Sequence, residues 1–162
     1  MTLSFAPWLN FRQVGAVVHI EPRIYGSERL RPDLDIIFPD QNLMVDVAIC
    51  HPATPSRKTS IPLAAASITE NGKISKYSAL AAKQASLFYP FVLETHGAYG
   101  KRTADLLKLL RQAASGSAHT LPCDLAQFNS HATRTLSIAL QRGNALVSRR
   151  GATEARAAAG RQ

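Results

Sequence analysis

Residues 31–50, RPDLDIIFPDQNLMVDVAIC, determine the fold that we predict for this chain. From Pro32 to Phe38, apolar residues alternate with Asp33 and Asp35, as in a strand with one buried face. Residues 43–50 alternate in the same way, and Asp46 is the single charged residue among them. The residues between the two runs, Pro39-Asp40-Gln41-Asn42, favour a tight turn, so we predict an antiparallel hairpin.

This hairpin can bring the carboxylates of Asp33 and Asp46 together on one face, although twelve residues separate them in the sequence. Two neighbouring carboxylates repel each other unless a cation lies between them. Hard oxygen ligands of this kind suit Mg²⁺ or Mn²⁺. A bound Mg²⁺ can lower the pKa of a coordinated water and polarise a phosphodiester. The pair therefore predicts a site for metal-dependent hydrolysis.

A basic helix face is predicted to follow the hairpin. Lys73, Lys76 and Tyr77 stand at positions i, i+3 and i+4 and share that face. A lysine there could hold a scissile phosphate or orient the attacking water, and Tyr77 could donate a hydrogen bond to the same group. Gln84 lies two turns beyond Tyr77 on a similar face and is a candidate substrate contact.

The remaining sequence favours a mixed α/β sheet packed against helices. Asn71-Gly72 is predicted to break the helical run that follows the hairpin, and Asp124 is predicted to cap the last helix. The predicted elements outside the hairpin are a short helix over 5–13, strands over 14–20 and 89–95, helical runs over 63–88 and 98–114, and a last helix over 125–148.

The net charge is +8, and it is concentrated in the C-terminal part of the chain. Residues 1–96 hold nine Lys/Arg and eight Asp/Glu, a net of +1, and residues 97–162 hold ten and three, a net of +7. This distribution favours a nucleic acid that is contacted through its phosphates. Lys101 and Arg102 are candidate substrate contacts in this part of the chain.

Several classes of protein are disfavoured. Cys50 and Cys123 are far apart and form no CxxC pair, which argues against a disulfide framework or a zinc site. No apolar run is as long as a membrane span, and the first residues lack the pattern of a signal peptide. We therefore expect an intracellular protein that does not bind membranes.

Three segments together resemble the PD-(D/E)xK nuclease superfamily: Arg31-Pro32-Asp33, Val45-Asp46-Val47 and Lys73-Ile74-Ser75-Lys76-Tyr77. The resemblance is closest to the restriction-endonuclease-like domain at the C-terminus of site-specific non-LTR retrotransposon proteins and of related reverse-transcriptase reading frames. Residues 90–97, PFVLETHG, look like the strand that follows in such reading frames. The resemblance covers roughly residues 14–112.

The resemblance implies a restriction-endonuclease-like mixed sheet flanked by helices, with a C-terminal helical extension. With the nuclease core assigned to residues 1–115, the sequence pattern itself predicts a basic helical extension over 116–148 and, from its small and polar residues, a disordered tail over 149–162. The implied activity is a Mg²⁺-dependent (or Mn²⁺-dependent) DNA endonuclease that nicks target DNA for a retroelement.

The resemblance also assigns roles to single residues. Asp33 and Asp46 would bind metal and act in catalysis with Lys73, Lys76 and Tyr77. Glu21 would be a possible third acid, and Arg31 would join Gln84, Lys101 and Arg102 as substrate contacts. The usual lysine two residues after the second acid is absent, because Val47-Ala48 follows Asp46. Lys73 or Lys76 would replace it, with a slight preference for Lys76 as the neighbour of Tyr77.

The implied partner is DNA or an RNA–DNA hybrid, in the nucleus if the host is eukaryotic. Family proteins carry a zinc knuckle and a reverse transcriptase upstream, and because this sequence has neither, it would be a fragment or a stand-alone remnant. Two alternatives stay open, a catalytically inactive nucleic-acid-binding remnant and a basic protein-interaction domain. Asp35, Glu94 and His51 could each serve the site or have only a structural role.

Overall fold

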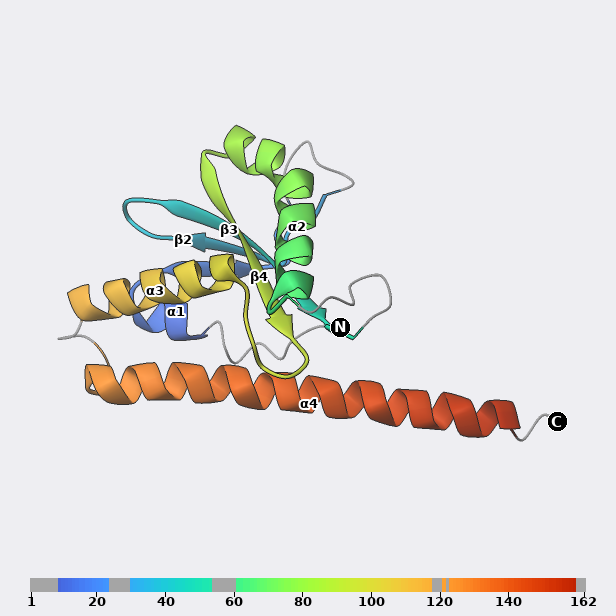
Figure 1. The fold of residues 1–162 in the computed structure, drawn as a ribbon. Helices are drawn as coiled ribbons and strands as arrows, with labels where there is room; N and C mark the ends of the chain where they lie inside the picture. Colours follow the sequence, from blue (N-terminus) through green and yellow to red (C-terminus); the bar gives the residue numbers. More distant parts are fainter. Residues whose placement is uncertain (1–8, 24–29, 54–60, 118–120, 122, 160–162) are drawn as a thin grey trace.

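Four strands form one mixed sheet in the order β1-β2-β3-β4, with helices packed against it (Figure 1). The computed structural model describes residues 9–23, 30–53, 61–117, 121 and 123–159. Its elements are α1 (Leu9–Gln13), β1 (Val17–Ile20), β2 (Leu34–Ile37), β3 (Asn42–Cys50), α2 (Ala64–Lys83), β4 (Ser86–Glu94), α3 (Lys101–Gly116) and α4 (Leu125–Ala159). The predicted α/β class and the mixed sheet with flanking helices are confirmed.

The hairpin predicted from the sequence is present as β2 and β3. These strands are antiparallel, and their register pairs Leu34 with Val45 and Ile37 with Asn42. β1 is antiparallel to β2, whereas β3 and β4 are parallel. Parallel neighbours need a crossover connection, which α2 supplies between β3 and β4.

Strand alternation gives each face of the sheet its own core. On one face, side chains of β2, β3 and β4 pack with α1, α3 and α4 in a cluster that includes Leu34, Val45, Phe91, Leu106 and Phe128. On the other face, Met44 of β3 packs against α2 in a cluster with Tyr77, Leu80 and Ala81. The predicted assignment of odd and even positions of β3 to opposite faces is therefore confirmed.

The face that carries α2 is only partly covered. α2 lies over β3 and β4. The β1 side chains that share this face are open to solvent, since Val17 is 54% exposed and His19 is also exposed. The end of the hairpin therefore lies beside an open part of the sheet.

The break predicted at Asn71-Gly72 does not occur, and α2 runs unbroken from Ala64 to Lys83. A glycine inside a helix costs about 1 kcal/mol relative to alanine. The burial of Tyr77, Leu80 and Ala81 against Met44 of the sheet outweighs that cost. Tertiary packing thus overrides the local signal.

The last helix is longer than predicted. The sequence predicts an end at Ser148 and a disordered tail over 149–162, but α4 continues to Ala159. The added segment is rich in alanine and arginine, which are strong helix formers, and has no proline. Residues 160–162 lie outside the described residues. Figure 1 shows the C-terminal part of α4 extending beyond the rest of the fold.

The start of α4 agrees with the prediction, because the backbone N–H of Gln127 donates to Oδ1 of Asp124 at 2.8 Å. At the other end of the chain, the predicted helix over 5–13 is present as α1, and residues 5–8 lie outside the described residues. Among the described helices, none is long and apolar enough to cross a membrane.

Candidate active site

Asp33 and Asp46 come together where the β2–β3 pairing ends. The register pairs Leu34 with Val45, and one further step along it places Asp33 opposite Asp46. Opposite residues of an antiparallel pair share a face, here the face that carries α2. Oδ2 of Asp33 accepts the backbone N–H of Val47 at 2.6 Å. The first acid is therefore held by the strand that carries the second.

The environment of these carboxylates opposes the accumulation of negative charge. Burial raises the pKa of Asp33, and the Val47 N–H opposes that shift by stabilising the ionised form. The charge of Asp46 raises the pKa of Asp33 further. Asp46 itself is only 3% exposed. A nearby positive charge would stabilise the ionised form of both carboxylates.

Lys73 of α2 supplies part of that charge. Its Nζ forms an ion pair with Oδ2 of Asp46, and the Lys73 side chain is 27% exposed. The lysine therefore reaches from solvent to a buried carboxylate, and its amine stands at the edge of the site.

Tyr77, one turn further along α2, is almost fully buried. Its hydroxyl donates to the backbone carbonyl of Arg31 at 3.0 Å. Burial raises the pKa of Tyr77, and the neighbouring carboxylates of Asp46 and Asp33 raise it further. Tyr77 therefore stays protonated at neutral pH and holds the segment that leads into Asp33.

Lys76 forms no ion pair with Asp33 or Asp46 in the described part of the chain, although the helix spacing allows it to share the face of Lys73. It is exposed, and its Nζ lies 4.7 Å from the centroid of the Tyr77 ring. The geometry brings Lys73 to Asp46, so it does not support the slight preference for Lys76.

Glu21 and Arg31 form an ion pair next to Asp33. Nη2 of Arg31 lies 2.7 Å from Oε2 of Glu21. The backbone N–H of Glu21 donates to the carbonyl of Asp33 at 2.7 Å. The charge of Glu21 also contributes to the raised pKa of Asp33, as the smallest of the causes. The possible third acid is thus near the pair, with its carboxylate engaged by Arg31.

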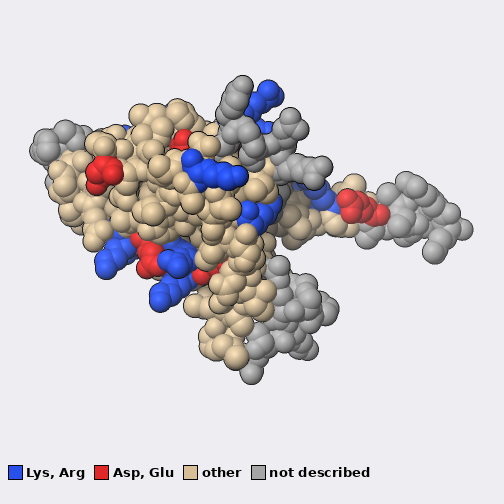
Figure 2. Space-filling view, turned by 90° about the horizontal axis from the view of Figure 1, so that it is seen from above, with Lys and Arg blue, Asp and Glu red and all other residues tan. Residues whose placement is uncertain are grey.

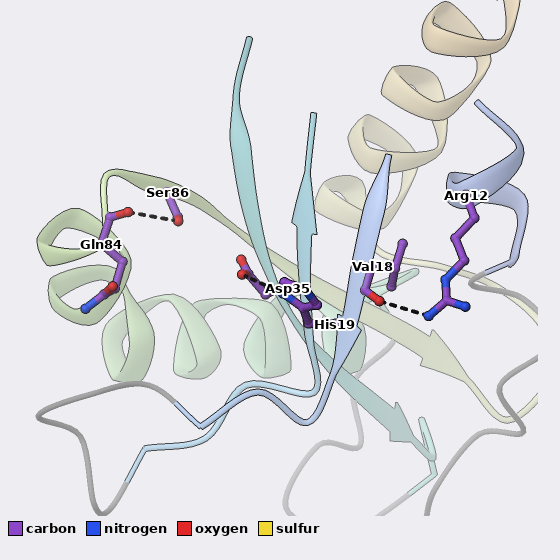
Figure 3. Close-up of polar contacts among 6 residues, drawn as sticks. All are labelled: Arg12, Val18, His19, Asp35, Gln84 and Ser86. Atoms are coloured by element: carbon purple, nitrogen blue, oxygen red, sulfur yellow. Dashed lines mark hydrogen bonds and ion pairs between the residues drawn. The ribbon is translucent and has the colours of Figure 1, made fainter. Parts of the chain in front are cut away.

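Two other candidates, Asp35 and Gln84, have the partners that Figure 3 draws. Oδ2 of Asp35 is 3.7 Å from Nδ1 of His19 on the neighbouring strand. Gln84 follows the last residue of α2, and its carbonyl accepts the hydroxyl of Ser86 at 3.2 Å. It stands seven residues beyond Tyr77, or about 10 Å along a helix.

In the same view, Arg12 of α1 donates to the carbonyl of Val18 at 3.0 Å and fixes α1 to β1.

Lys101 and Arg102 are exposed at the first turn of α3. The backbone N–H of Arg102 donates to Oε1 of Glu70 on α2 at 2.9 Å. Glu70 stands one turn before Lys73 on α2, so this bond ties the two predicted contacts to the helix that supplies the lysine. Glu94 is buried at the end of β4, opposite Cys50, and therefore lies away from the two aspartates.

Glu70 is an important residue that the sequence pattern did not mark. It is 5% exposed, and its Oε1 also accepts the N–H of Thr103 at 3.4 Å. Gly100, the residue before α3, offers no side-chain cap, so Glu70 performs that role from another helix. Burial raises the pKa of Glu70, while the two N–H groups act against that shift. The available signals were a helix start without a capping side chain at Gly100 and a single acid, Glu70, in the preceding helix.

Basic side chains do not form one continuous patch on the face in Figure 2. Lys and Arg lie there in separate groups, with acidic residues between some of them. Within the described ranges, no group of three or more His, Cys, Asp or Glu side chains converges to hold a metal ion. The carboxylate pair of Asp33 and Asp46 is thus the donor set of the candidate site.

No protein-family model matches this sequence, and no curated protein is significantly similar to it.

Proposed function

We propose that this protein is a Mg²⁺-dependent DNA endonuclease with a restriction-endonuclease-like fold. The observation that carries the proposal is the juxtaposition of Asp33 and Asp46 at the end of the hairpin, with the Lys73 amine on Asp46. The order of elements is compatible with this fold, because the short helix α1 precedes the sheet and α2 follows the third strand.

The donor set fits Mg²⁺ or Mn²⁺. Mg²⁺ is often bound through one or two carboxylates together with waters and substrate phosphates, so Asp33 and Asp46 suffice as protein ligands. Burial raises the pKa of Asp33 and the charge of Asp46 raises it further, so a cation held by both carboxylates would stabilise their ionised forms. When bound, the ion would supply an activated water and polarise the phosphodiester.

The side chains around the pair have separate tasks in this proposal. Lys73 is placed to donate a hydrogen bond to a phosphate oxygen or to the attacking water, which stabilises the charge that develops in the transition state. Tyr77, which keeps its proton, acts as a positioning residue through its bond to the Arg31 carbonyl. Arg31 and Glu21 hold each other beside the pair.

Nucleic acid is the partner that the charge favours. Exposed positions of α4 carry Arg134, Arg142, Arg149, Arg150 and Arg156 against the single acid Glu154. A helix with this balance is suited to contact phosphates without reading bases. The nicking of a target for a retroelement, with an associated reverse transcriptase, rests on the sequence resemblance alone.

A second candidate function is that of a catalytically inactive DNA-binding remnant. The observation that favours it is the Lys73–Asp46 ion pair, which already neutralises one of the two acids. In that case the lysine would have a structural role, and the basic α4 would be the functional surface. This candidate predicts salt-sensitive DNA binding that persists when Asp33 or Asp46 is replaced.

A plasmid-nicking assay with Mg²⁺ or Mn²⁺ tests the proposal. We expect the natural protein to convert supercoiled DNA to open circles and Asp46→Asn to lose that activity. Asp40→Asn is a matched control, because Asp40 is an exposed acid in the turn of the same hairpin. If the natural protein binds DNA but leaves the plasmid intact with either metal, the result contradicts the endonuclease and supports the inactive DNA-binding remnant.

A further inference from the structure

A cleft of about 840 Å³ lies between the C-terminal half of β3, the turn after β4 and the middle of α4. Its size falls within the range of small-molecule and cofactor sites. It begins at Val47, whose N–H is bound by Asp33 and which directly follows Asp46. The cleft lies on the face of the sheet that carries α4, whereas Asp33 and Asp46 lie on the face that carries α2, so it is separate from the candidate active site.

The lining of the cleft combines an apolar strand with polar side chains. Val47, Ala48 and Ile49 supply the apolar part. His51 and His96 stand together, with ring centroids 5.5 Å apart and planes at 70°. Among the described lining residues none is Lys, Arg, Asp or Glu, so neither a free phosphate nor a hard cation would find a charged partner there.

Amide groups enter the cleft from α4. Gln141 and Asn144 both line it, one helical turn apart. Nδ2 of Asn144 donates to the carbonyl of Thr95 at 2.8 Å, which fixes α4 against the turn after β4. Side-chain amides and histidine rings are groups that proteins use for hydrogen bonding to base edges and for stacking on bases.

We propose that this cleft binds an unpaired nucleobase of a nucleic acid strand that passes over the α4 face of the sheet. The ligand class rests on the proposed function, whereas the site itself rests on the cleft and its lining. The base would lie on the apolar strand with an edge toward the amides of α4 and a face toward the histidine pair. The sugar and phosphate would stay at the mouth, and Arg142 and Arg149, which follow the lining residues Gln141 and Ser148 on α4, are exposed.

Fluorescence anisotropy in EDTA tests this proposal without cleavage. The probes are a labelled single-stranded DNA of mixed sequence and the same strand with abasic sites. We expect the natural protein to bind the complete strand about tenfold more tightly, which is typical of one bound base. His96→Ala and Gln141→Ala, both at exposed positions, should remove most of that preference and leave binding of the abasic strand unchanged.

Gln127→Ala, an exposed glutamine at the start of α4 and outside the cleft, is the matched control and should keep the full preference. Equal affinity for the two strands, absence of binding to both, or a preference that survives both cleft variants would overturn the proposal. Plasmid nicking without a base preference would remove the cleft proposal alone. A base preference that is lost in the variants, in a protein that does not nick DNA, would support the cleft and remove the endonuclease.

Discussion

Asp33 binds the backbone N–H of Val47, the residue that directly follows Asp46. The two acids are therefore coupled through β3 as well as through their charges. A cation between them would relieve the repulsion that helps to raise the pKa of Asp33. The effects of metal, of pH and of substitution around the pair are thus linked.

Metal binding should stabilise the fold. At a Mg²⁺ or Mn²⁺ concentration about ten times the dissociation constant, binding to the folded state alone adds about 1.4 kcal/mol, or roughly 3–6 °C in Tm. Asp33→Asn keeps an oxygen that can accept the Val47 N–H but removes the charge, so it should abolish the shift. Thermal melts with and without metal measure both effects. An equal shift in Asp33→Asn and in the natural protein would place the ion elsewhere.

Lys73 and Lys76 should differ in their effect on activity. Lys73→Met removes the amine beside Asp46 and should lower kcat by about a hundredfold or more, the effect of losing one transition-state donor. It should also lower the free energy of unfolding by roughly 1–3 kcal/mol, below the effect at a fully buried pair because Lys73 is partly exposed. Lys76→Met should change kcat only a few-fold. Nicking rates and chemical denaturation distinguish them, and a larger loss of kcat in Lys76→Met would reverse the assignment.

Glu70 should make stability depend on pH. Burial raises the pKa of Glu70, so the folded state holds the proton more tightly than the unfolded chain. Its contribution to the free energy of unfolding is fully present below the ordinary pKa and is lost as pH rises through the raised value. Glu70→Gln lacks this dependence and can still accept the Arg102 N–H. The Tm of Glu70→Gln relative to the natural protein should therefore increase with pH across that window, while exposed Glu154→Gln shows no such trend.

Gly100 and Gly72 should respond to alanine in opposite directions. A methyl group at Gly100 would overlap the carboxylate of Glu70, so Gly100→Ala should lower the free energy of unfolding by about 1–3 kcal/mol. Gly72 lies within α2 with open space around it, so Gly72→Ala should raise that free energy by up to about 1 kcal/mol. In a Glu70→Ala background the cost at Gly100 should largely disappear. Additive effects of the two changes would show that the overlap does not limit this position.

Arg149 and Arg150, exposed on α4, should contribute to DNA affinity through phosphates alone. Each phosphate contact adds about 0.9 to the slope of log affinity against log salt. Arg149→Ala/Arg150→Ala should therefore lower that slope by up to about 2 and weaken binding equally for unrelated duplexes. Arg12→Ala, whose guanidinium binds the Val18 carbonyl, is the control and should leave the slope unchanged. An unchanged slope in the double variant would exclude this part of α4 from the DNA interface.

The sequence was sufficient for features that depend on neighbouring residues. Alternation over 32–38 and 43–50 with the turn between them predicted the hairpin, and the same alternation placed Asp33 and Asp46 on one face. By contrast, the choice between Lys73 and Lys76 depends on the position of α2 along the length of β3. Burial of Ala66 and Tyr77 against the sheet fixes that position, and helix periodicity alone does not predict it.

The role of Glu70 and the presence of the cleft could not be predicted from the sequence, because both depend on contacts between distant parts of the chain. The carboxylate of Glu70 meets the amide of Arg102 across 32 positions of sequence, so no local pattern marks it as a cap. The cleft joins β3 to residues of α4 that lie far from it in the chain, and the length of α4 itself was underestimated. Long-range packing, rather than propensity, decides both features.

The opposition of Asp33 and Asp46 also restricts how the hairpin can change in length. Opposite residues in an antiparallel pair always face the same way, and a slip by one residue would set Asp33 against Val45 or Val47 and turn Asp46 to the other side of the sheet. Insertions and deletions in the turn at 39–41 should therefore be tolerated only when the strands keep their parity. The turn is at the opposite end of the hairpin from the two acids, yet it would evolve under a constraint that the acids impose.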